Sequence, residues 1–141
     1  MKPHEKILKM IEEVDPNDTA TLDEIDARVW AYLNLKDDFK ISFHKDCGAI
    51  TYRHNSWPQD ERSILRHGFS NPKYTRSFDA IHSIASTDFV YNIEFVKDGW
   101  GICSYSGIST EHNGETPSLV SPELAYLHAI IQAIAHERGE L

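Results

Sequence analysis

Two stretches with helical periodicity open the chain. Apolar residues recur at spacings of three and four between Pro3 and Val14, and again between Leu22 and Leu33, which is the pattern of amphipathic helices. Residues 15–18 between them hold two aspartates and a proline, a composition that ends helices. We therefore expect an antiparallel helical pair joined by a short acidic turn.

Two later stretches of the chain alternate with a period of two. Apolar residues take every second position in residues 39–43 and 50–52, and again in residues 89–96 and 100–104. The two halves of each stretch are joined by a short turn that contains glycine. Alternation of this kind, interrupted by such a turn, predicts two β-hairpins.

The last helix carries the most complete set of helix signals. Ser121 is suited to cap it, Pro122 takes its first position, and Gly139 follows its end. A shorter helix is expected after Ser77, with Asp79 in its first turn. The apolar stripe predicted for the last helix consists of Leu124, Leu127, His128, Ile131, Ile134 and Ala135.

Residues 55–73 form the least regular part of the sequence. Asn55 and Gly68 give it the punctuation of a loop, although Pro58–Arg66 also fits one or two helical turns. We expect a variable surface excursion here and a further long loop at residues 107–120.

The order of these elements predicts an α+β fold. Helices stand before, between and after two hairpins, so the expected sheet is antiparallel and has about four strands. Residues 1–141 contain no internal repeat, low-complexity tract or linker, and their number is typical of a single domain.

The motif at residues 74–80, Tyr-Thr-Arg-Ser-Phe-Asp-Ala, precedes a hairpin with an aromatic residue at its turn and a helix that opens Ser-Pro-Glu-Leu-Ala at residue 121. Over residues 74–137 this arrangement resembles the phage ABA-sandwich domain family, and residues 22–33 resemble that family's N-terminal part more loosely. The resemblance rests on Tyr74, Thr75, Ser77, Asp79, Ala80, Trp100, Pro122, Leu124, Ala125, Ala129 and Ala133.

The resemblance implies a three-layer α/β/α sandwich, in which helices cover both faces of the antiparallel sheet. Members of the family occur in bacteriophages and prophages and mostly lack an assigned activity. The resemblance therefore implies a phage or prophage protein of unknown function, and it brings no catalytic residues. Residues 36–72 lie outside the matching part and look specific to this chain.

The composition of the chain restricts its expected location in the cell. It has 141 residues, a hydrophobic fraction of 40% and a mean hydropathy of −0.46, and no apolar run approaches the ~18 residues of a membrane span. The first residues are charged and include no apolar export segment. The two cysteines, Cys47 and Cys103, make no disulfide framework. We expect a cytoplasmic protein with no membrane contact.

Negative charge is concentrated in the predicted helical pair. Residues 12–38 hold nine acidic residues and two basic ones, which accounts for −7 of the net charge of −8. Such a balance argues against a nucleic-acid-binding surface, which requires clustered Lys and Arg. The acidic face that includes Asp23, Glu24 and Asp26 either keeps the chain soluble or faces a basic protein partner.

Three residues of the first predicted hairpin are of types that bind zinc. His44 and Cys47 flank its turn, and His54 ends its return strand. They would make a metal site if the fold brought them together. The alternative, that they are exposed strand-end histidines and a turn thiol, is favoured because their spacing matches no standard finger or ribbon.

Aromatic residues follow the second predicted hairpin. Tyr91, Trp100 and Tyr105 are candidates for the floor of a site for a planar or nucleotide-like ligand, unless they belong to the core. His128, on the apolar stripe of the last helix, is either a catalytic base or, as we interpret it, a buried histidine with a hydrogen-bond partner.

These patterns favour a non-enzymatic binding module that recognises a protein partner, with no cofactor. The alternative is a small-ligand-binding protein that uses Tyr91, Trp100 and Tyr105, and a third hypothesis is a metal-dependent hydrolase. The sequence contains no phosphate-binding glycine loop, no Gly-x-Ser-x-Gly and no His-Glu-x-x-His. Each hypothesis therefore depends on which side chains the fold brings together.

Overall fold

A computed structural model places eleven elements along the chain. It describes residues 1–45, 47–58, 63–85, 89–96, 99–107, 113–114, 119 and 121–140, with the backbone alone at 89–96, 99–107 and 113–114. The elements are α1 (Pro3–Glu13), α2 (Thr19–Asn34), β1 (Phe39–His44), β2 (Ala49–His54), β3 (Ile64–Arg66), the 3-10 turn η1 (Gly68–Ser70), α3 (Phe78–His82), β4 (Phe89–Val96), β5 (Gly99–Gly107), β6 (Asn113–Gly114) and α4 (Pro122–Glu137).

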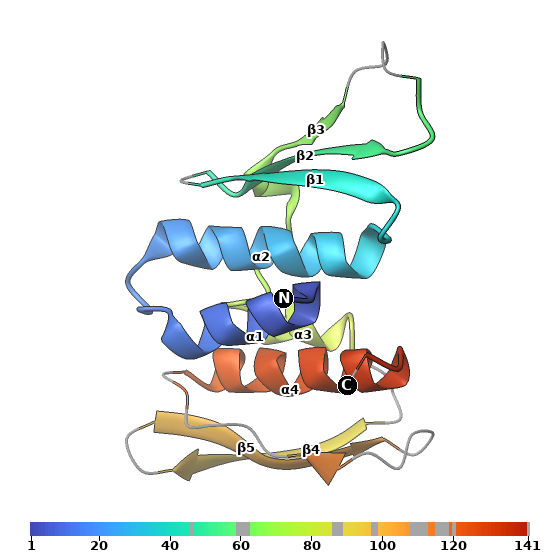
Figure 1. Ribbon diagram of the computed structural model, residues 1–141. Helices are drawn as coiled ribbons and strands as arrows, with labels where there is room; N and C mark the ends of the chain where they lie inside the picture. The colour runs from blue at the N-terminus through green and yellow to red at the C-terminus, as the bar shows by residue number, and fades with distance from the viewer. Residues whose placement is uncertain are drawn as a thin grey trace.

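The α+β class, the helical pair, both hairpins and the last helix are confirmed. β1 pairs with β2, and β4 with β5, in antiparallel register around the two predicted turns. Helices α1 and α2 run antiparallel beside one another (Figure 1). Among the described helices, none combines the length and the apolar composition that crossing a lipid bilayer requires.

The helices lie between two separate sheets. The described strands form a three-stranded sheet in the order β1-β2-β3 and another in the order β4-β5-β6. Figure 1 shows the layers in sequence: the first sheet, then α2, then α1 and α3, then α4, then the β4-β5 sheet. The predicted arrangement, helices on both faces of one sheet of about four strands, is therefore not confirmed, because no described strand pairs across the two hairpins.

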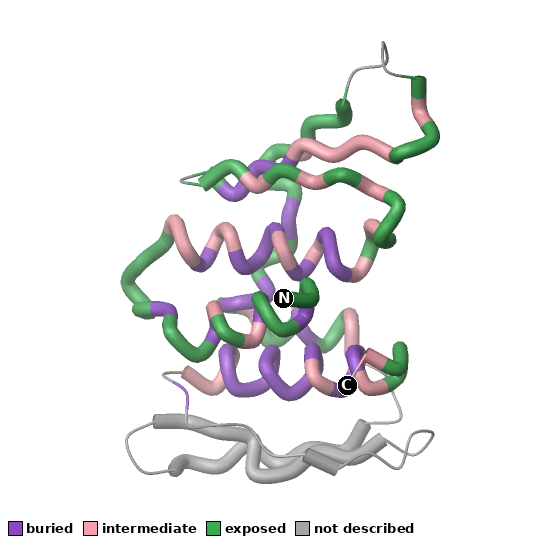
Figure 2. The backbone as a smooth tube through the Cα atoms, in the orientation of Figure 1, coloured by how far each residue is buried: buried purple, intermediate pink, exposed green. Residues whose placement is uncertain are grey.

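Helix α4 is buried on almost every side. Its cap is as predicted, since the Ser121 side chain accepts a hydrogen bond from Leu124 N and Pro122 is the first helical residue. Ten of its sixteen residues are buried (Figure 2), because α1 and α3 pack on one side of it and β4 and β5 on the other (Figure 1). The predicted single stripe was too narrow, since it assumed that one face met solvent.

The described core is divided into a large and a small cluster. The large cluster lies among the four helices, with Ile25, Ile81 and Ile131 all 0% exposed. The small cluster consists of Ala27, Ala31 and Ile50 between α2 and the β1-β2-β3 sheet. Helix α2 thus contributes to both clusters through opposite faces.

Part of the predicted excursion is a strand. Ile64–Arg66 pairs with β2 as β3, so the helical alternative for Pro58–Arg66 is wrong for residues 64–66. The Arg66 guanidinium stacks on the Trp30 ring at 3.9 Å and donates to Asn71 Oδ1. These contacts attach β3 and η1 to α2, although the Leu65 side chain remains exposed.

Candidate functional site

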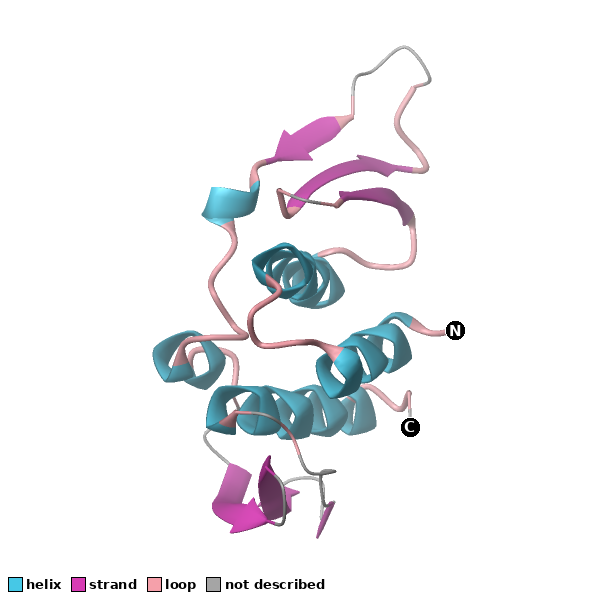
Figure 3. Ribbon diagram, turned by 90° about the vertical axis from the view of Figure 1, so that its left-hand side faces the viewer, coloured by secondary structure: helices cyan, strands magenta, loops and turns pink. Residues whose placement is uncertain are grey.

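A groove of about 860 Å³ lies on the side of the molecule where both termini lie (Figure 3). It is bounded by the start of α1, the second half of α2, β1 and residues 138–140. We call it the cationic groove. Its lining consists of Met1, Lys2, Pro3, Lys6, Ile7, Arg28, Ala31, Tyr32, Leu33, Asn34, Leu35, Lys36, Asp37, Phe39, Ile41, Phe43, Arg138 and Glu140.

The groove has apolar walls that the fold leaves partly uncovered. Phe39, Ile41 and Phe43 alternate along β1 toward α2 and are only half-buried, whereas Ile50 on the next strand is 0% exposed. The reason is the position of β1, which is the outer strand of its sheet and overhangs the groove on the side where the N- and C-termini lie (Figure 3). Helix α2 therefore covers the inner face of β1 only in part, and no other described element completes its burial.

Positive charge surrounds these walls. The groove holds five cationic side chains and two acidic ones, a balance of +3 in a chain of net charge −8. Lys6 and Lys36 are exposed at its rim. The cationic side chains are Lys2, Lys6, Arg28, Lys36 and Arg138.

Arg28 is the cation that is built most firmly into the wall. Its guanidinium stacks on the Phe43 ring, 4.1 Å from the centroid, and its Nε lies 3.8 Å from a Glu24 carboxylate oxygen, beyond hydrogen-bond distance. Nε is shielded from solvent and has no hydrogen-bond partner among the described residues. The ion pair with Glu24 and the stacking on Phe43 hold the guanidinium in place at the groove wall.

Residues 138–140 form one end of the groove. Tyr32 Oη donates to Glu140 Oε1 at 3.0 Å, and Arg138 Nη1 donates to the Tyr32 carbonyl at 2.9 Å. Lys2 Nζ donates to the Glu140 carbonyl at 3.2 Å. Burial, and next the hydrogen bond to Glu140, raises the pKa of Tyr32 to about 12. The phenol is consequently neutral, and this end of the groove is fixed by contacts between α1, α2 and residues 138–140.

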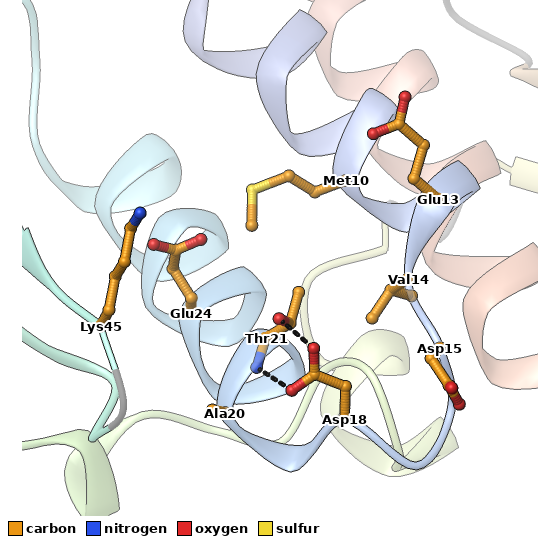
Figure 4. Close-up of a pocket in the computed structure, with 9 residues that line it drawn as sticks. All are labelled: Met10, Glu13, Val14, Asp15, Asp18, Ala20, Thr21, Glu24 and Lys45. Carbon is orange, nitrogen blue, oxygen red and sulfur yellow. Dashed lines mark hydrogen bonds between the residues drawn. The ribbon is translucent and has the colours of Figure 1, made fainter.

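A second depression, of about 580 Å³, lies where α1 turns into α2. Figure 4 shows Asp18 turned back onto Thr21, whose N and Oγ1 both donate to it, at 3.2 and 2.6 Å. These hydrogen bonds lower the pKa of Asp18 and cap α2. The carboxylate at the centre of this acidic depression thus has a structural task. Within the described part of the chain, no three His, Cys, Asp or Glu residues are grouped so that they could hold a metal ion.

The residues predicted to face a partner are in different environments. Asp26 is 0% exposed, so its assignment to a partner-facing surface is wrong. It accepts from Thr75 N at 2.9 Å and from Arg76 Nη2 at 2.7 Å. Burial raises the pKa of Asp26, although the bonds from Thr75 and Arg76 oppose that rise. Asp23 accepts from Arg76 and Lys73, and Glu24 lines the acidic depression.

The predicted metal residues are not brought together. His44 and Cys47 lie at the turn of the β1-β2 hairpin, whereas His54 pairs with Phe39 at the opposite end of the ladder. Five residue steps separate the two histidines, roughly 17 Å along the strands. His54 Nε2 lies 2.6 Å from Asp38 Oδ2 instead, and this hydrogen bond is the main cause of the lowered pKa of Asp38.

The predicted aromatic floor lies outside the part of the chain whose side chains are described. Tyr91 and Tyr105 are opposite one another in the β4-β5 ladder, and Trp100 is opposite Phe95. The pairing places all three residues in one hairpin beside α4. The ligand site proposed there stays a prediction.

His128 is a buried histidine with a carboxylate partner. It is 2% exposed, and its Nε2 lies 3.2 Å from Glu12 Oε1 across the α1-α4 interface. Burial lowers the pKa of His128, with Glu12 acting in the opposite direction. It lines neither depression described above, so the interpretation as a structural histidine is the one that the contacts support.

No motif or run of basic residues in the sequence indicated the cationic groove. Its basic residues come from three segments, at positions 2 and 6, 28 and 36, and 138, and two of them fall inside the acidic window 12–38. A search for basic residues that approach across the ends of predicted helices would have been needed. Comparison of the chain with protein-family models, curated proteins and solved structures found no match.

Proposed function

We propose that this chain is a non-enzymatic binding module that holds a segment of a partner protein in the cationic groove. The segment carries both carboxylates and apolar side chains. The observation that carries the proposal is the set of five cations around half-buried apolar walls in a chain of net charge −8. Lys6 and Lys36, which are exposed at the rim, are the expected contacts for its carboxylates.

Physical complementarity supports a segment of this composition. Apolar side chains that cover Phe39, Ile41 and Phe43 contribute about 25 cal/mol for each Å² removed from water. Carboxylates at the rim add specificity and a faster association rate. An uncharged segment would gain nothing from the charges at the rim, and a basic one would be repelled.

A panel of fluorescein-labelled decapeptides tests the proposal. In one set, a central run of Val, Ile or Phe is flanked by Asp or Glu, and in the control set Lys replaces the acidic residues. We expect members of the acidic set to bind, as measured by fluorescence anisotropy. Lys6→Glu should weaken that binding about fivefold, because it reverses a charge at the groove rim.

Lys9→Glu is the matched control for that variant. Lys9 lies on the same helix and is also exposed, but it does not line the groove. Binding to this variant should stay within about twofold of the original. Failure of every acidic peptide to bind, or equal losses in the two variants, would contradict the proposal. So would a single-stranded oligonucleotide that displaces the peptide at equal concentration.

The volume of the groove favours a second candidate function, the binding of a small amphipathic anion. About 860 Å³ falls within the range of small-molecule sites, which are mostly apolar with a few placed polar groups. Dodecanoate is a suitable probe in isothermal titration calorimetry. Saturable binding of dodecanoate that is weakened in Lys6→Glu, with no binding of the acidic peptides, would favour this candidate over a protein partner.

We also propose that the chain acts as an accessory protein of a phage or prophage, within the host cytoplasm. The support is the sequence resemblance over residues 74–137 to the phage ABA-sandwich domain family. The proposal concerns the setting of the protein and adds nothing to the chemistry of the groove.

A further inference from the structure

The unpaired edge of β1 adds a directional feature to the cationic groove. β1 is bonded to β2 on one side, and no described strand pairs with its other side. Strands at such edges present backbone N–H and C=O groups that an additional strand can bond. The same strand supplies Phe39, Ile41 and Phe43 to the groove wall, so the free edge and the apolar wall are continuous.

The register identifies which backbone groups point outward. Asn55 N donates to the Asp38 carbonyl at 2.8 Å, so this opposed pair is a hydrogen-bonded one. Opposed pairs in an antiparallel ladder alternate between bonded and non-bonded. The bonded pairs that follow are Lys40 with Arg53, Ser42 with Thr51, and His44 with Ala49.

The residues between those pairs direct their backbone groups away from β2. Phe39 N is used locally, because it donates to the Lys36 carbonyl at 3.1 Å. The N–H and C=O groups of Ile41 and Phe43 therefore face the free edge. A strand placed there gains a short row of backbone bonds while alternate side chains enter the groove.

We propose that the partner segment binds as an added β-strand on the free edge of β1. This inference rests on the proposed function and specifies its binding mode. The inward side chains of the segment are apolar and cover Ile41 and Phe43. Beyond those positions, the inward side chains at the ends of the segment are acidic and lie toward Lys6 and Lys36, which complement them in charge, because side chains on the other face of the strand point away from the groove. A bound helix would use the same charges and walls but would leave the backbone edge of β1 unpaired.

Amide hydrogen exchange followed by NMR distinguishes these modes. The probe is the tightest-binding acidic decapeptide of the panel, added to full-length protein. In the free protein, the amides of Ile41 and Phe43 should exchange fast, while those of Lys40, Ser42 and His44 are protected by β2. At about 90% saturation, exchange at residues 41 and 43 should slow roughly tenfold, because it then proceeds through the free fraction.

The outcomes separate this inference from the function on which it rests. If the peptide binds in a Lys6-dependent manner and residues 41 and 43 keep their fast exchange, strand addition is overturned and the binding function stands. Slow exchange at residues 41 and 43 in the free protein also overturns it, because the edge is then already occupied. If no acidic peptide binds, the proposed function itself fails.

A variant of the peptide supplies an independent measurement. In an added strand, the backbone N–H groups of alternate residues point toward β1, and those of the other residues point away from it. N-methylation of alternate peptide residues removes one of these two sets of donors and keeps every side chain. One of the two alternating methylation patterns should weaken binding about tenfold or more, and the other should have a much smaller effect. Equal effects of the two patterns would contradict strand addition.

Discussion

Single residues join parts of the chain that are far apart in sequence, and Asp26 is the main example. Its carboxylate lies on α2 and accepts from the backbone of Thr75 and the guanidinium of Arg76. The motif at residues 74–80, which the sequence singles out, is thereby attached to the helical pair. A pattern of acidic residues cannot reveal this role, because buried and exposed aspartates look alike in a sequence.

Asp26→Ala should lower the free energy of unfolding by about 1–3 kcal/mol, because it leaves the buried backbone N–H of Thr75 without its acceptor. Urea denaturation measures the loss. Asp23→Ala is the matched control, since Asp23 binds the same Arg76 at 2.6 Å but is partly exposed. Its cost should be below about 1 kcal/mol. Comparable losses in both variants would refute the structural role given to Asp26.

His128 should make stability depend on pH. Burial lowers the pKa of His128 below 6.5 in the folded protein, so the unfolded chain binds its proton first as the pH falls. The contribution is complete above pH 6.5 and is lost as the pH decreases toward the lowered pKa. His128→Gln should therefore show a smaller decline in unfolding free energy between pH 7.5 and pH 5.5. An unchanged decline would show that other groups cause it.

At the scale of elements, the sequence predicts those features that depend on residues close together in the chain. The helices, the hairpins and the caps at Ser77 and Ser121 follow from periodicity and from residues within three positions of each end. β3 has only three residues, and Ile64 and Leu65 are both exposed. No alternation of apolar and polar residues therefore indicates this strand in the sequence. Its pairing with β2 depends on contacts between separate elements.

Gly68 tests one of those contacts. A Cβ at this position would lie 1.9 Å from the carbonyl oxygen of Cys47, at the turn between β1 and β2. Because that atom belongs to the backbone, a side-chain rotation cannot relieve the clash. Gly68→Ala should cost about 1–3 kcal/mol and change NMR shifts around Cys47.

Gly139→Ala provides a comparison of a different kind. Nothing lies within 4 Å of a Cβ there, but the backbone φ of +72° is left-handed. Its cost should be about 1–2 kcal/mol, with no shift changes near Cys47. If Gly68→Ala left the hairpin turn undisturbed, the contact between η1 and that turn would be absent in solution.

At the scale of the whole molecule, net charge and local charge have opposite signs. The −8 of the chain predicts solubility and argues against polyanions in general, yet the groove carries +3. The difference arises because folding gathers Lys6, Arg28 and Arg138 from three segments. No window of consecutive residues contains that information, so the site could not be predicted from the sequence.

Binding at the groove should weaken with salt. Raising NaCl from 0.05 to 0.5 M shortens the screening length from about 14 to about 4 Å, so the dissociation constant of an acidic decapeptide should rise roughly tenfold. Most of that change should lie in the association rate, which stopped-flow fluorescence measures. An affinity that does not depend on salt would mean that the apolar walls alone hold the peptide.

The division of the core into two clusters has a consequence for cooperativity. The four helices share the large cluster, whereas the β1-β2-β3 sheet packs on α2 through Ala27, Ala31 and Ile50, with the partly buried side chains of Trp30, Leu35, Ile41, Phe43 and Tyr52 around them. Because most of the side chains at this contact are only partly buried, we expect the sheet to have a lower free energy of local opening than the helices and to detach before they unfold. The surface proposed for recognition therefore lies partly on the least firmly anchored unit of the fold, and a bound partner would stabilise that unit most.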